Sequence, residues 1–469
     1  MMISSDEIRR AHREAMESAG MPDPAVRTFL LHLERVAHGA TGTLDRDRIE
    51  PIDTLPDADQ LSGSAADVGE RALTETVVVK LNGGLGTSMG LERAKSLLEV
   101  RDGLSFLDLI ARQVLALRDA TGADIPLLLM NSFRTAADSD AVLARYPGLA
   151  LDGLPLGFVQ HKVPKVLADT LAPAAAPDDP EMAWCPPGHG DLYTALTTSG
   201  VLDRLLDRGV RYAFVSNADN LGAVVDAPLL GSMIERGADF MMEAADRTPA
   251  DRKGGHLCRL GDGRLALREF AQCPADEAGE FQDVELYRYF NTNNLWIRLE
   301  ALRSLLDTHD GVLPLDTIVN RKTLDPREPS SPEVLQLETA MGAALSLFDR
   351  AVAVRVPRRR FSPVKTTSDL LGVRSDAYEL GDDWRITLRP EREAPPNIDL
   401  DDRYFKLIDD FEARFTYGVP SLRRCDALTV EGDVWFGTDV EVRGAVRIST
   451  DGIRAVVPSG TVVEEDLEL

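Results

Sequence analysis

The sequence predicts an α/β protein in which a mostly parallel, Rossmann-like sheet is followed by a C-terminal, left-handed parallel β-helix. Three observations lead to this prediction. The β-branched residues 77–79 feed a glycine-rich loop at 81–90, as a strand buried on both faces does in a parallel sheet. Strand and helix patterns alternate after this loop. From Leu428 onward, apolar residues recur every six positions.

The glycine-rich loop is the first candidate binding site. Its glycines let the backbone approach a ligand closely, and such a loop can hold a phosphate or a nucleotide. The spacing does not fit a Walker A motif, because Gly90 is followed by Leu91 and Glu92. It does fit a loose dinucleotide fingerprint, with Asp102 as a later acid. A turn that only reverses the chain stays open as an alternative.

Later segments continue the alternation. Apolar residues at helical spacing predict a helix at 104–120, and apolar runs predict strands at 125–130, 212–216 and 240–242. Ligands of such sheets bind outside the carboxyl ends of the strands. Asn131 and the polar residues after the 212–216 run stand at this position, so we expect functional side chains there.

The two ends of the chain differ from this central part. Two helices are predicted within 4–38, followed by a polar connecting segment to about residue 70. At the other end a helix is predicted at 402–415, and two apolar rows of period six then indicate a hexapeptide β-helix, with an ordinary meander as the alternative. The rows are Leu428, Val434, Val440 and Val446, and Val430, Phe436, Val442 and Ile448. The predicted domains are 1–70, 71–395 and 396–469.

Composition excludes several classes of protein. The 469 residues, 44% hydrophobic and 28% charged, are typical of a globular chain with a large core. Residues 1–30 lack the apolar region of a signal peptide and no apolar run reaches about 18 residues, which predicts a cytoplasmic protein with no membrane partner. The net charge of −25 argues against nucleic acid as a partner. The four cysteines are scattered and are predicted to be free thiols.

Polar motifs follow several of the predicted strands. S-N-A-D-N at 216–220 places a carboxylate, Asp219, where it can hold Mg²⁺, although a helix-capping turn is an alternative. The string F-V-Q-H-K-V-P-K contains Gln160, whose amide can offer both a donor and an acceptor to a ligand; a surface glutamine is the plainer interpretation.

Three further strings have both a functional and a structural interpretation. P-P-G-H-G-D at 186–191 is a turn entering a helix, and its histidine is either a solvated turn residue or a ligand contact. F-N-T-N-N-L-W at 290–296 is polar within an apolar strand pattern, and so lines a pocket or marks a sheet edge. Residues 355–365 contain four arginines and one lysine without an acid, which predicts either a solvated basic face or a phosphate site.

These strings together resemble the motifs of the eukaryotic-type UTP–glucose-1-phosphate uridylyltransferases, also called UDP-glucose pyrophosphorylases. The resemblance includes L-N-G-G-L-G-T-S-M-G followed by Lys-Ser, and V-K-T-T-S-D-L-L near 365; the motifs occur in the family's order from about residue 76 to 450. The chain departs from the family in four places: Arg93-Ala94 replaces the usual Gly-Pro, Lys165 stands where Arg is more common, and Pro249 and Arg252 depart from its usual pattern.

The resemblance implies a GT-A-like nucleotidyltransferase sheet and assigns roles to residues. It implies that Lys95 and Lys365 are catalytic and that Asp219 holds Mg²⁺. The nucleotide would contact Leu81, Asn82, Gly83, Gly84, Lys95, Gln160, Gly188, Asn217, Asp219 and Lys365. The sugar phosphate would contact Gly83, Gly84, His189, Asn217, Asp219, Asn291, Thr292 and Asn293.

The activity implied is the reversible conversion of MgUTP and α-D-glucose 1-phosphate to UDP-glucose and pyrophosphate. The sugar phosphate is an ionised nucleophile, so the protein must mainly neutralise charge, and no general base is required. A dinucleotide-dependent oxidoreductase, a sister enzyme for another sugar 1-phosphate and a non-catalytic sugar-nucleotide sensor are alternatives. We also predict a homo-oligomer through residues 428–469, because a β-helix exposes its stacking face at a free end.

Overall fold

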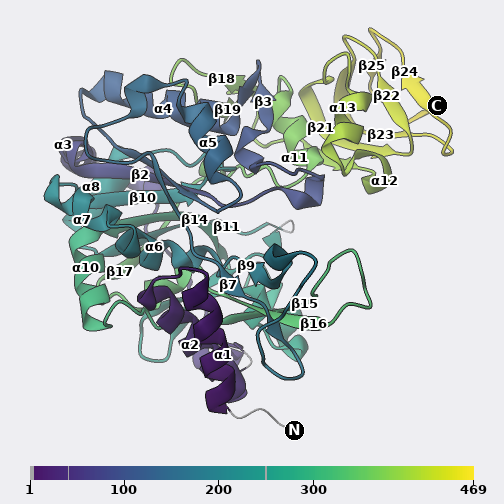
Figure 1. Cartoon of the computed structure of the whole chain (residues 1–469). Coiled ribbons are helices and arrows are strands. Elements are labelled where there is room, and N and C mark those ends of the chain that lie inside the picture. The colour runs from purple at the N-terminus through teal and green to yellow at the C-terminus, as the bar shows by residue number, and fades with distance from the viewer. Residues whose placement is uncertain (1–4, 41, 249–250) are drawn as a thin grey trace.

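The computed structural model describes residues 5–40, 42–248 and 251–469, and a ten-stranded sheet lies at its centre (Figure 1). The strands follow the order β1-β12-β14-β10-β2-β5-β6, while β11 pairs with β14 and β17, and β13 pairs with β12. Their bounds are β1 (Ile49–Glu50), β2 (Thr76–Asn82), β5 (Leu127–Asn131), β6 (Gly157–Val159), β10 (Tyr212–Asn217), β11 (Phe240–Asp246), β12 (His256–Leu260), β13 (Leu265–Arg268), β14 (Tyr289–Arg298) and β17 (Ala351–Arg355).

The strands around the glycine-rich loop are parallel. β2 pairs in parallel with both β10 and β5, and β5 pairs in parallel with β6. This confirms the predicted α/β class and the parallel sheet at this position. β14 instead runs antiparallel between β10 and β11. Its direction depends on the path of the connecting chain, which a local apolar pattern does not contain.

Helices cover both faces of the sheet, as its sequence alternation predicts (Figure 1). Val78 of β2 belongs to a core that includes residues of α4 and α8, whereas Val77 and Val79 belong to a second core shared with α6, α7 and α10. The helices are α4 (Phe106–Thr121), α5 (Ala136–Leu143), α6 (Leu192–Thr198), α7 (Val201–Asp207), α8 (Ala227–Glu235) and α10 (Leu299–Thr308).

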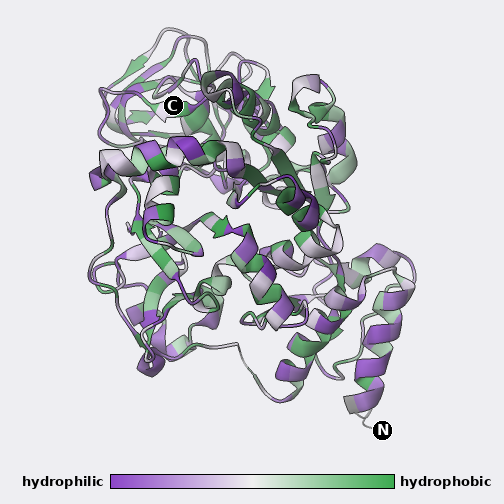
Figure 2. Cartoon of the chain, turned by 90° about the vertical axis from the view of Figure 1, so that its left-hand side faces the viewer, coloured by the Kyte–Doolittle hydropathy of each residue, from purple (hydrophilic) through white to green (hydrophobic). Residues whose placement is uncertain are grey.

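The N-terminal part contains the two predicted helices, α1 (Ser5–Ser18) and α2 (Asp23–Ala37). Figure 2 shows that α1 is largely hydrophilic. α2 begins with a proline in its first turn and buries Phe29 and Leu33 in a core shared with β7 (Val163–Pro164), β9 (Trp184–Cys185) and β16 (Glu333–Glu338). The pair therefore packs behind the 186–191 loop.

The segment predicted as a connection contains α3 (Gly63–Ala72), which lies directly against α8. A Cβ added at Gly69 would stand 1.7 Å from the carbonyl oxygen of Ala227. A Cβ added at Gly231 would stand 1.7 Å from the carbonyl oxygen of Ala65. Only glycine fits at either position, so the two helix backbones touch each other.

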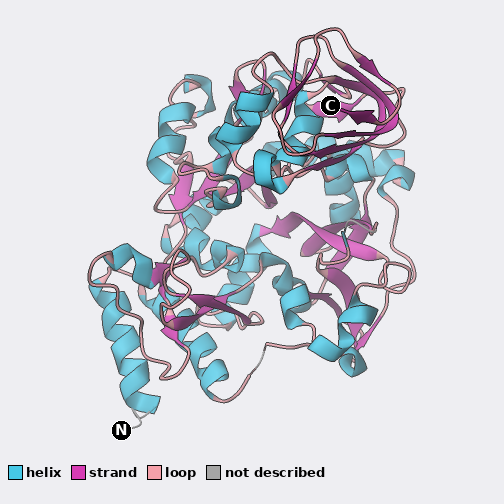
Figure 3. Ribbon diagram, turned by 90° about the vertical axis from the view of Figure 1, so that its right-hand side faces the viewer, coloured by secondary structure: helices cyan, strands magenta, loops and turns pink. Residues whose placement is uncertain are grey.

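Residues 397–469 include parallel strands that we call the C-terminal stack, at the opposite end of the molecule from the N-terminal helices (Figure 3). Leu428 lies opposite Val446, and Val434 lies opposite Ala455. All eight residues of the two predicted period-six rows are buried. The strands are β20 (Asn397–Leu400), β21 (Ser421–Glu431), β22 (Val434–Phe436), β23 (Glu441–Ser449), β24 (Ala455–Val457), β25 (Val462–Val463) and β26 (Leu467–Glu468).

The prediction of one helix at 402–415 is wrong. The structure has two, α12 (Asp402–Phe405) and α13 (Ile408–Arg414), because Leu407 has an extended backbone with φ −85° and ψ 142°. The break directs Leu407 towards the glycine-rich loop, where a Cβ added at Gly90 would be 3.1 Å from the Leu407 side chain. The tertiary contact thus overrides a continuous helical pattern.

Two further predictions concern the chain as a whole. The four cysteines are free thiols, as predicted. No helix among the described residues combines the length and the apolar character that a membrane crossing requires.

Candidate active site

The glycine-rich loop and the S-N-A-D-N motif meet because β2 and β10 are neighbours. Leu81 pairs with Asn217 in the parallel ladder, so the carboxyl ends of the two strands lie side by side. The Lys95 N–H donates to the Gly84 carbonyl oxygen at 3.0 Å, which folds this lysine back over the loop. Its Nζ lies 2.7 Å from Oδ2 of Asp219, and both side chains are partly exposed. A cation and an anion thus face the site together.

The loop requires glycine at particular positions. Gly86 and Gly90 have φ of 64° and 76°, in the left-handed region that favours glycine. A Cβ at Gly83 would stand 2.8 Å from Nε2 of Gln160, whereas a Cβ at Gly84 would meet nothing within 4 Å. Gly83 therefore lets the Gln160 amide reach the loop, and Gly84 leaves open space beside it.

Gln160 is held at the edge of this loop by its neighbours. Its N–H donates to the carbonyl oxygen of Asn131 at 2.8 Å, and its side chain is buried. The next residue, His161, donates its N–H to Asp191 at 2.7 Å and places its ring Nδ1 2.8 Å from the same carboxylate. The segment that follows β6, with Gln160 and His161, is therefore fixed to the 186–191 loop.

Asn82 is placed differently from the other predicted contacts. Its buried Nδ2 donates to Oδ1 of Asn131 and to Oγ of Ser139, both at 2.7 Å. Thr135 in turn donates its hydroxyl to the Asn82 carbonyl oxygen at 2.7 Å. The side chain points into the protein, so it supports the shape of the loop and does not face a ligand.

The 186–191 loop presents a neutral histidine. Gly188 has φ 82°, and a Cβ there would stand 2.4 Å from the Thr339 carbonyl oxygen. The Met341 N–H donates to Nδ1 of His189 at 2.9 Å. Burial lowers the pKa of His189 to about 4, so the ring is neutral at neutral pH and its proton is on Nε2. This atom can donate a hydrogen bond to an anion.

The N-T-N string of β14 contains residues of two orientations. The Asn291 and Asn293 side chains bond to each other at 2.8 Å, and Asn293 has a positive φ of 59°. Thr292, by contrast, is buried and donates its hydroxyl to the Glu243 carbonyl oxygen at 2.7 Å. The two asparagines remain candidates for a sugar contact. The Thr292 hydroxyl is used internally, and the predicted sugar contact of Thr292 stays a prediction.

Glu269 is a candidate that the sequence did not indicate. Its carboxylate lies beside Gly255, where a Cβ would stand 2.4 Å from Oε2, and the Gly255 carbonyl oxygen accepts the Asn291 N–H at 3.0 Å. Burial raises the pKa of Glu269, and the charge of Lys365 opposes that shift. A lone glutamate after a strand gave no local signal; only its position beside Asn291 and Lys365 identifies it.

The basic run at 355–365 divides into paired arginines and one free lysine. The arginines Arg355, Arg358, Arg359 and Arg360 form ion pairs with Asp57, Asp246, Asp251, Asp59, Glu243 and Asp226. Among the described residues, Lys365 has no carboxylate within ion-pair distance; its Nζ lies 5.8 Å from the centre of the Phe361 ring. Its charge remains available for an anionic ligand.

The metal donors at this site are few. No three His, Cys, Asp or Glu residues in the described part of the chain are grouped so that they could hold a metal ion. Mg²⁺ commonly takes one or two protein carboxylates and completes its shell with substrate phosphates and water. The single carboxylate of Asp219 therefore fits Mg²⁺ that arrives with a polyphosphate.

A large cavity lies away from these residues. It has a volume of 490 Å³ and is formed by the β12–β13 hairpin, β17 and neighbouring residues such as Phe348. None of the predicted site residues lines it. The convergence of charge and backbone at the glycine-rich loop locates the candidate site better than cavity size does.

Comparisons with known proteins agree with this arrangement. A family model described as UTP–glucose-1-phosphate uridylyltransferase matches residues 26–443. The enzyme of that name from Solanum tuberosum is 41% identical over 443 residues, covering 93% of this chain and 90% of the relative. The one from Saccharomyces cerevisiae is 40% identical over 475 residues, covering 98% and 93%.

Solved structures give the same result. A mutant of UDP-glucose pyrophosphorylase from Leishmania major, solved in complex with UDP-glucose, has a TM-score of 0.94 and 44% identity, with 100% of both chains covered. A UDP-glucose phosphorylase from Trypanosoma brucei has a TM-score of 0.90 and 44% identity, covering 98% of this chain and 99% of that one. This chain therefore belongs to the UTP–glucose-1-phosphate uridylyltransferase family.

Proposed function

We propose that this chain catalyses the reversible reaction of MgUTP with α-D-glucose 1-phosphate to give UDP-glucose and pyrophosphate. The observation that carries the proposal is the Lys95–Asp219 pair, 2.7 Å apart, over a glycine-rich loop at the carboxyl ends of β2 and β10. Ligands of parallel sheets bind at this edge. Relatives covering nearly the whole chain are named for this activity, and one solved relative holds UDP-glucose.

The reaction is a direct in-line displacement. An oxygen of the ionised sugar phosphate forms a bond to the α-phosphorus of UTP, and the bond to the bridging oxygen breaks, so pyrophosphate leaves with the electron pair. No proton has to be removed from the nucleophile. The barrier comes from bringing two anions together and from charge on the leaving group, which Lys95 and Lys365 neutralise.

Asp219 has two tasks in this proposal. Its carboxylate holds the Lys95 ammonium in place over the loop, and it is the protein group that would bind Mg²⁺ together with the UTP phosphates. The metal ion, when bound, supplies positive charge to the phosphate oxygens. Asn217, two residues earlier in the same motif, lies where β10 ends beside the nucleotide loop.

The remaining residues divide between base and sugar. Gln160, beside Gly83, is positioned to read the donor and acceptor pattern of the uracil edge. His189 donates from Nε2 to the sugar phosphate as a neutral ring. Asn291 and Asn293, with Glu269 at the same corner, bind sugar hydroxyl groups.

The C-terminal stack is proposed to be a left-handed β-helix. From β21 onward its parallel partners are separated by 18 to 21 residues, close to three hexapeptides per coil, whereas β20 and β21 pair across 30 residues. Ile453, Val456 and Val462 are exposed at 70%, 52% and 46%. We propose that a second copy of the chain covers them, and light scattering of the full chain should then exceed the 51.3 kDa of one chain. A mass of one chain at micromolar concentration would exclude this contact.

Turnover with a panel of sugar 1-phosphates tests the function. Purified chain with UTP, Mg²⁺ and glucose 1-phosphate should release pyrophosphate and form UDP-glucose. Faster turnover of another sugar 1-phosphate would instead indicate a sister enzyme. Binding of UDP-glucose without turnover would indicate a sensor, and binding of NAD an oxidoreductase. The cytoplasmic location stays a prediction from the sequence.

A further inference from the structure

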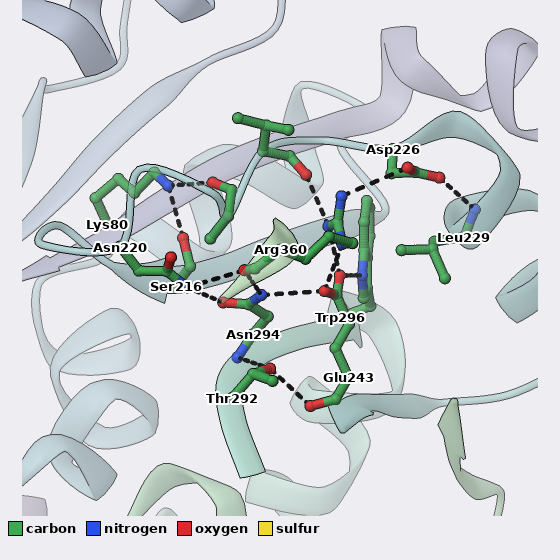
Figure 4. Close-up of polar contacts among 12 residues, drawn as sticks. Lys80, Ser216, Asn220, Asp226, Leu229, Glu243, Thr292, Asn294, Trp296 and Arg360 are labelled. Carbon is green, nitrogen blue, oxygen red and sulfur yellow. Dashed lines mark hydrogen bonds and ion pairs between the residues drawn. The ribbon is translucent and has the colours of Figure 1, made fainter. Parts of the chain in front are cut away.

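A buried ion pair lies behind the proposed site. Glu243 of β11 is fully buried, and Arg360 is 6% exposed. Arg360 donates from Nε and Nη2 to the two carboxylate oxygens of Glu243, each at 2.7 Å (Figure 4). The same oxygens accept hydrogen bonds from Trp296 Nε1 at 2.9 Å and Asn294 Nδ2 at 3.0 Å. The pair is thus fully hydrogen-bonded and geometrically fixed.

Asn220 connects this pair to the Asp219 turn. Its side chain is 1% exposed, and its Nδ2 donates to the Arg360 carbonyl oxygen at 3.1 Å. Its Oδ1 accepts the Ser362 N–H at 3.0 Å. The adjacent Asp219 carbonyl oxygen accepts the Val364 N–H at 3.2 Å. Three hydrogen bonds therefore attach residues 219–220 to the segment immediately before Lys365.

The other parts of the turn are also held. Lys80, a buried residue of β2, donates to Ser216 Oγ at 2.7 Å and to the Ala223 carbonyl oxygen at 2.6 Å. Arg360 donates to the Val224 carbonyl oxygen at 2.9 Å. Residues 216–224 are therefore held near both ends, and the segment before Lys365 is attached to the middle.

Lys365 depends on this attachment more than Lys95 does. The Lys95 ammonium is held directly by Asp219. Among the described residues no carboxylate holds the Lys365 ammonium, so its position follows from its backbone. A buried ion pair is itself weak evidence for stability, since its desolvation costs about as much as its attraction gains. A positioning role accounts for the network better than stabilisation does.

Building on the proposed function, we propose that Asn220, anchored by the Arg360–Glu243 pair, is a positioning residue that fixes the distance between Asp219 and Lys365. The two charged groups then act on one polyphosphate as a single preorganised unit. Misplacement of a reacting group by about 1 Å can cost about 100-fold in rate. Asn220 touches no substrate in this proposal and acts only through Lys365 and Asp219.

Asn220→Ala tests the proposal, with Asp239→Asn as a matched control. Asp239 is a buried carboxylate immediately before β11, the strand that contains Glu243. It accepts hydrogen bonds from Arg298 and Arg350, which lie outside the 216–224 turn. Asn220→Ala should lower kcat about 10- to 100-fold, while KM for UTP changes by less than about threefold. Asp239→Asn should leave kcat unchanged. If Asn220→Ala does not fold, Asn220→Asp keeps the side-chain shape and should show the same split between kcat and KM.

Two measurements distinguish a failure of the positioning role of Asn220 from a failure of the proposed function. Hydrogen exchange at the Ser362 and Val364 amides should accelerate in Asn220→Ala and not in Asp239→Asn, whatever the activity. In a Lys365→Ala background, Asn220→Ala should lower kcat much less than it does alone. Equal losses in both backgrounds, or unchanged exchange, would overturn the positioning role. If Lys365→Ala alone left kcat intact, the proposed role of Lys365 would fail instead.

Discussion

The region around Asp219 and Lys365 and the C-terminal stack are built by opposite means. The first buries charged and amide side chains, with Arg360, Glu243 and Asn220 all nearly inaccessible to solvent. The second buries apolar side chains in two regular rows, and its charged pairs, such as Arg443 with Glu441, lie at the surface. We infer that directional hydrogen bonds fix the positions of the reacting groups in the first region, whereas repeated apolar rows stabilise the second.

A cavity in the C-terminal stack should have the largest effect on stability and none on chemistry. Phe436 is 1% exposed and stacks on Phe415 with ring centres 4.9 Å apart. Phe436→Ala should lower the free energy of unfolding by about 3–5 kcal/mol, measured by urea denaturation. The kcat of the folded variant should stay unchanged, and Asp426→Ala, at an exposed position outside the proposed contact with a second copy, should alter neither quantity. A lower kcat at unchanged stability would show that the C-terminal stack also contributes to catalysis.

Removal of either lysine should have the opposite signature. Lys95→Ala and Lys365→Ala should each lower kcat by about 100-fold or more, by analogy with the loss of one oxyanion donor. The thermal midpoint should change little, since both side chains lie at the site. Steady-state kinetics with UTP and glucose 1-phosphate measure the effect. A change confined to KM would assign the lysines to ground-state binding.

Acid should destabilise the folded chain through three histidines whose pKa is lowered in the folded state. Burial lowers the pKa of His189 to about 4 and those of His32 and His256 to about 3, below the ordinary value of 6.5. Between these limits the unfolded chain binds more protons than the folded one, so stability falls as pH falls from 6.5 towards 3. Thermal midpoints across this range check the slope. His32→Asn should reduce the slope of stability against pH. An unchanged slope would show that His32 does not contribute to the acid sensitivity.

The smallest expected effect concerns the base. Gln160→Ala should reduce the preference for UTP over other nucleoside triphosphates by about 10-fold, because base contacts are lost while phosphate contacts remain. Gly83→Ala should act similarly, since its Cβ would displace the Gln160 amide. Competition assays with mixed triphosphates measure the preference. Unchanged selectivity in both variants would place the base reader elsewhere.

Local patterns were enough to predict part of this molecule. The position of Asp219 near Lys95 follows from a strand-end rule, because neighbouring parallel strands end at one edge. The buried rows of the C-terminal stack follow from their period. These features repeat or lie next to a strand, so a single stretch of sequence contains the signal.

Pairings between distant segments were not predictable. Arg360 lies 117 residues from Glu243, and nothing near either residue identifies the partner. The arginines of the 355–365 run look alike in sequence, yet they bind acids from separate parts of the chain. Glu269 and the internal orientation of Thr292 likewise depend on tertiary packing. The Leu407 break shows the same dependence, since its contact is with Gly90.

The glycine contact between α3 and α8 has a consequence for synthesis of the chain. α3 ends at Ala72 and α8 begins at Ala227, about 155 residues later. At translation rates of about 5–20 residues per second, α8 is synthesised roughly eight to thirty seconds after α3. The waiting surface of α3 consists of glycine and alanine, which offer little apolar area for a wrong contact. The face of α3 that later contacts α8 therefore exposes little apolar surface before α8 is synthesised.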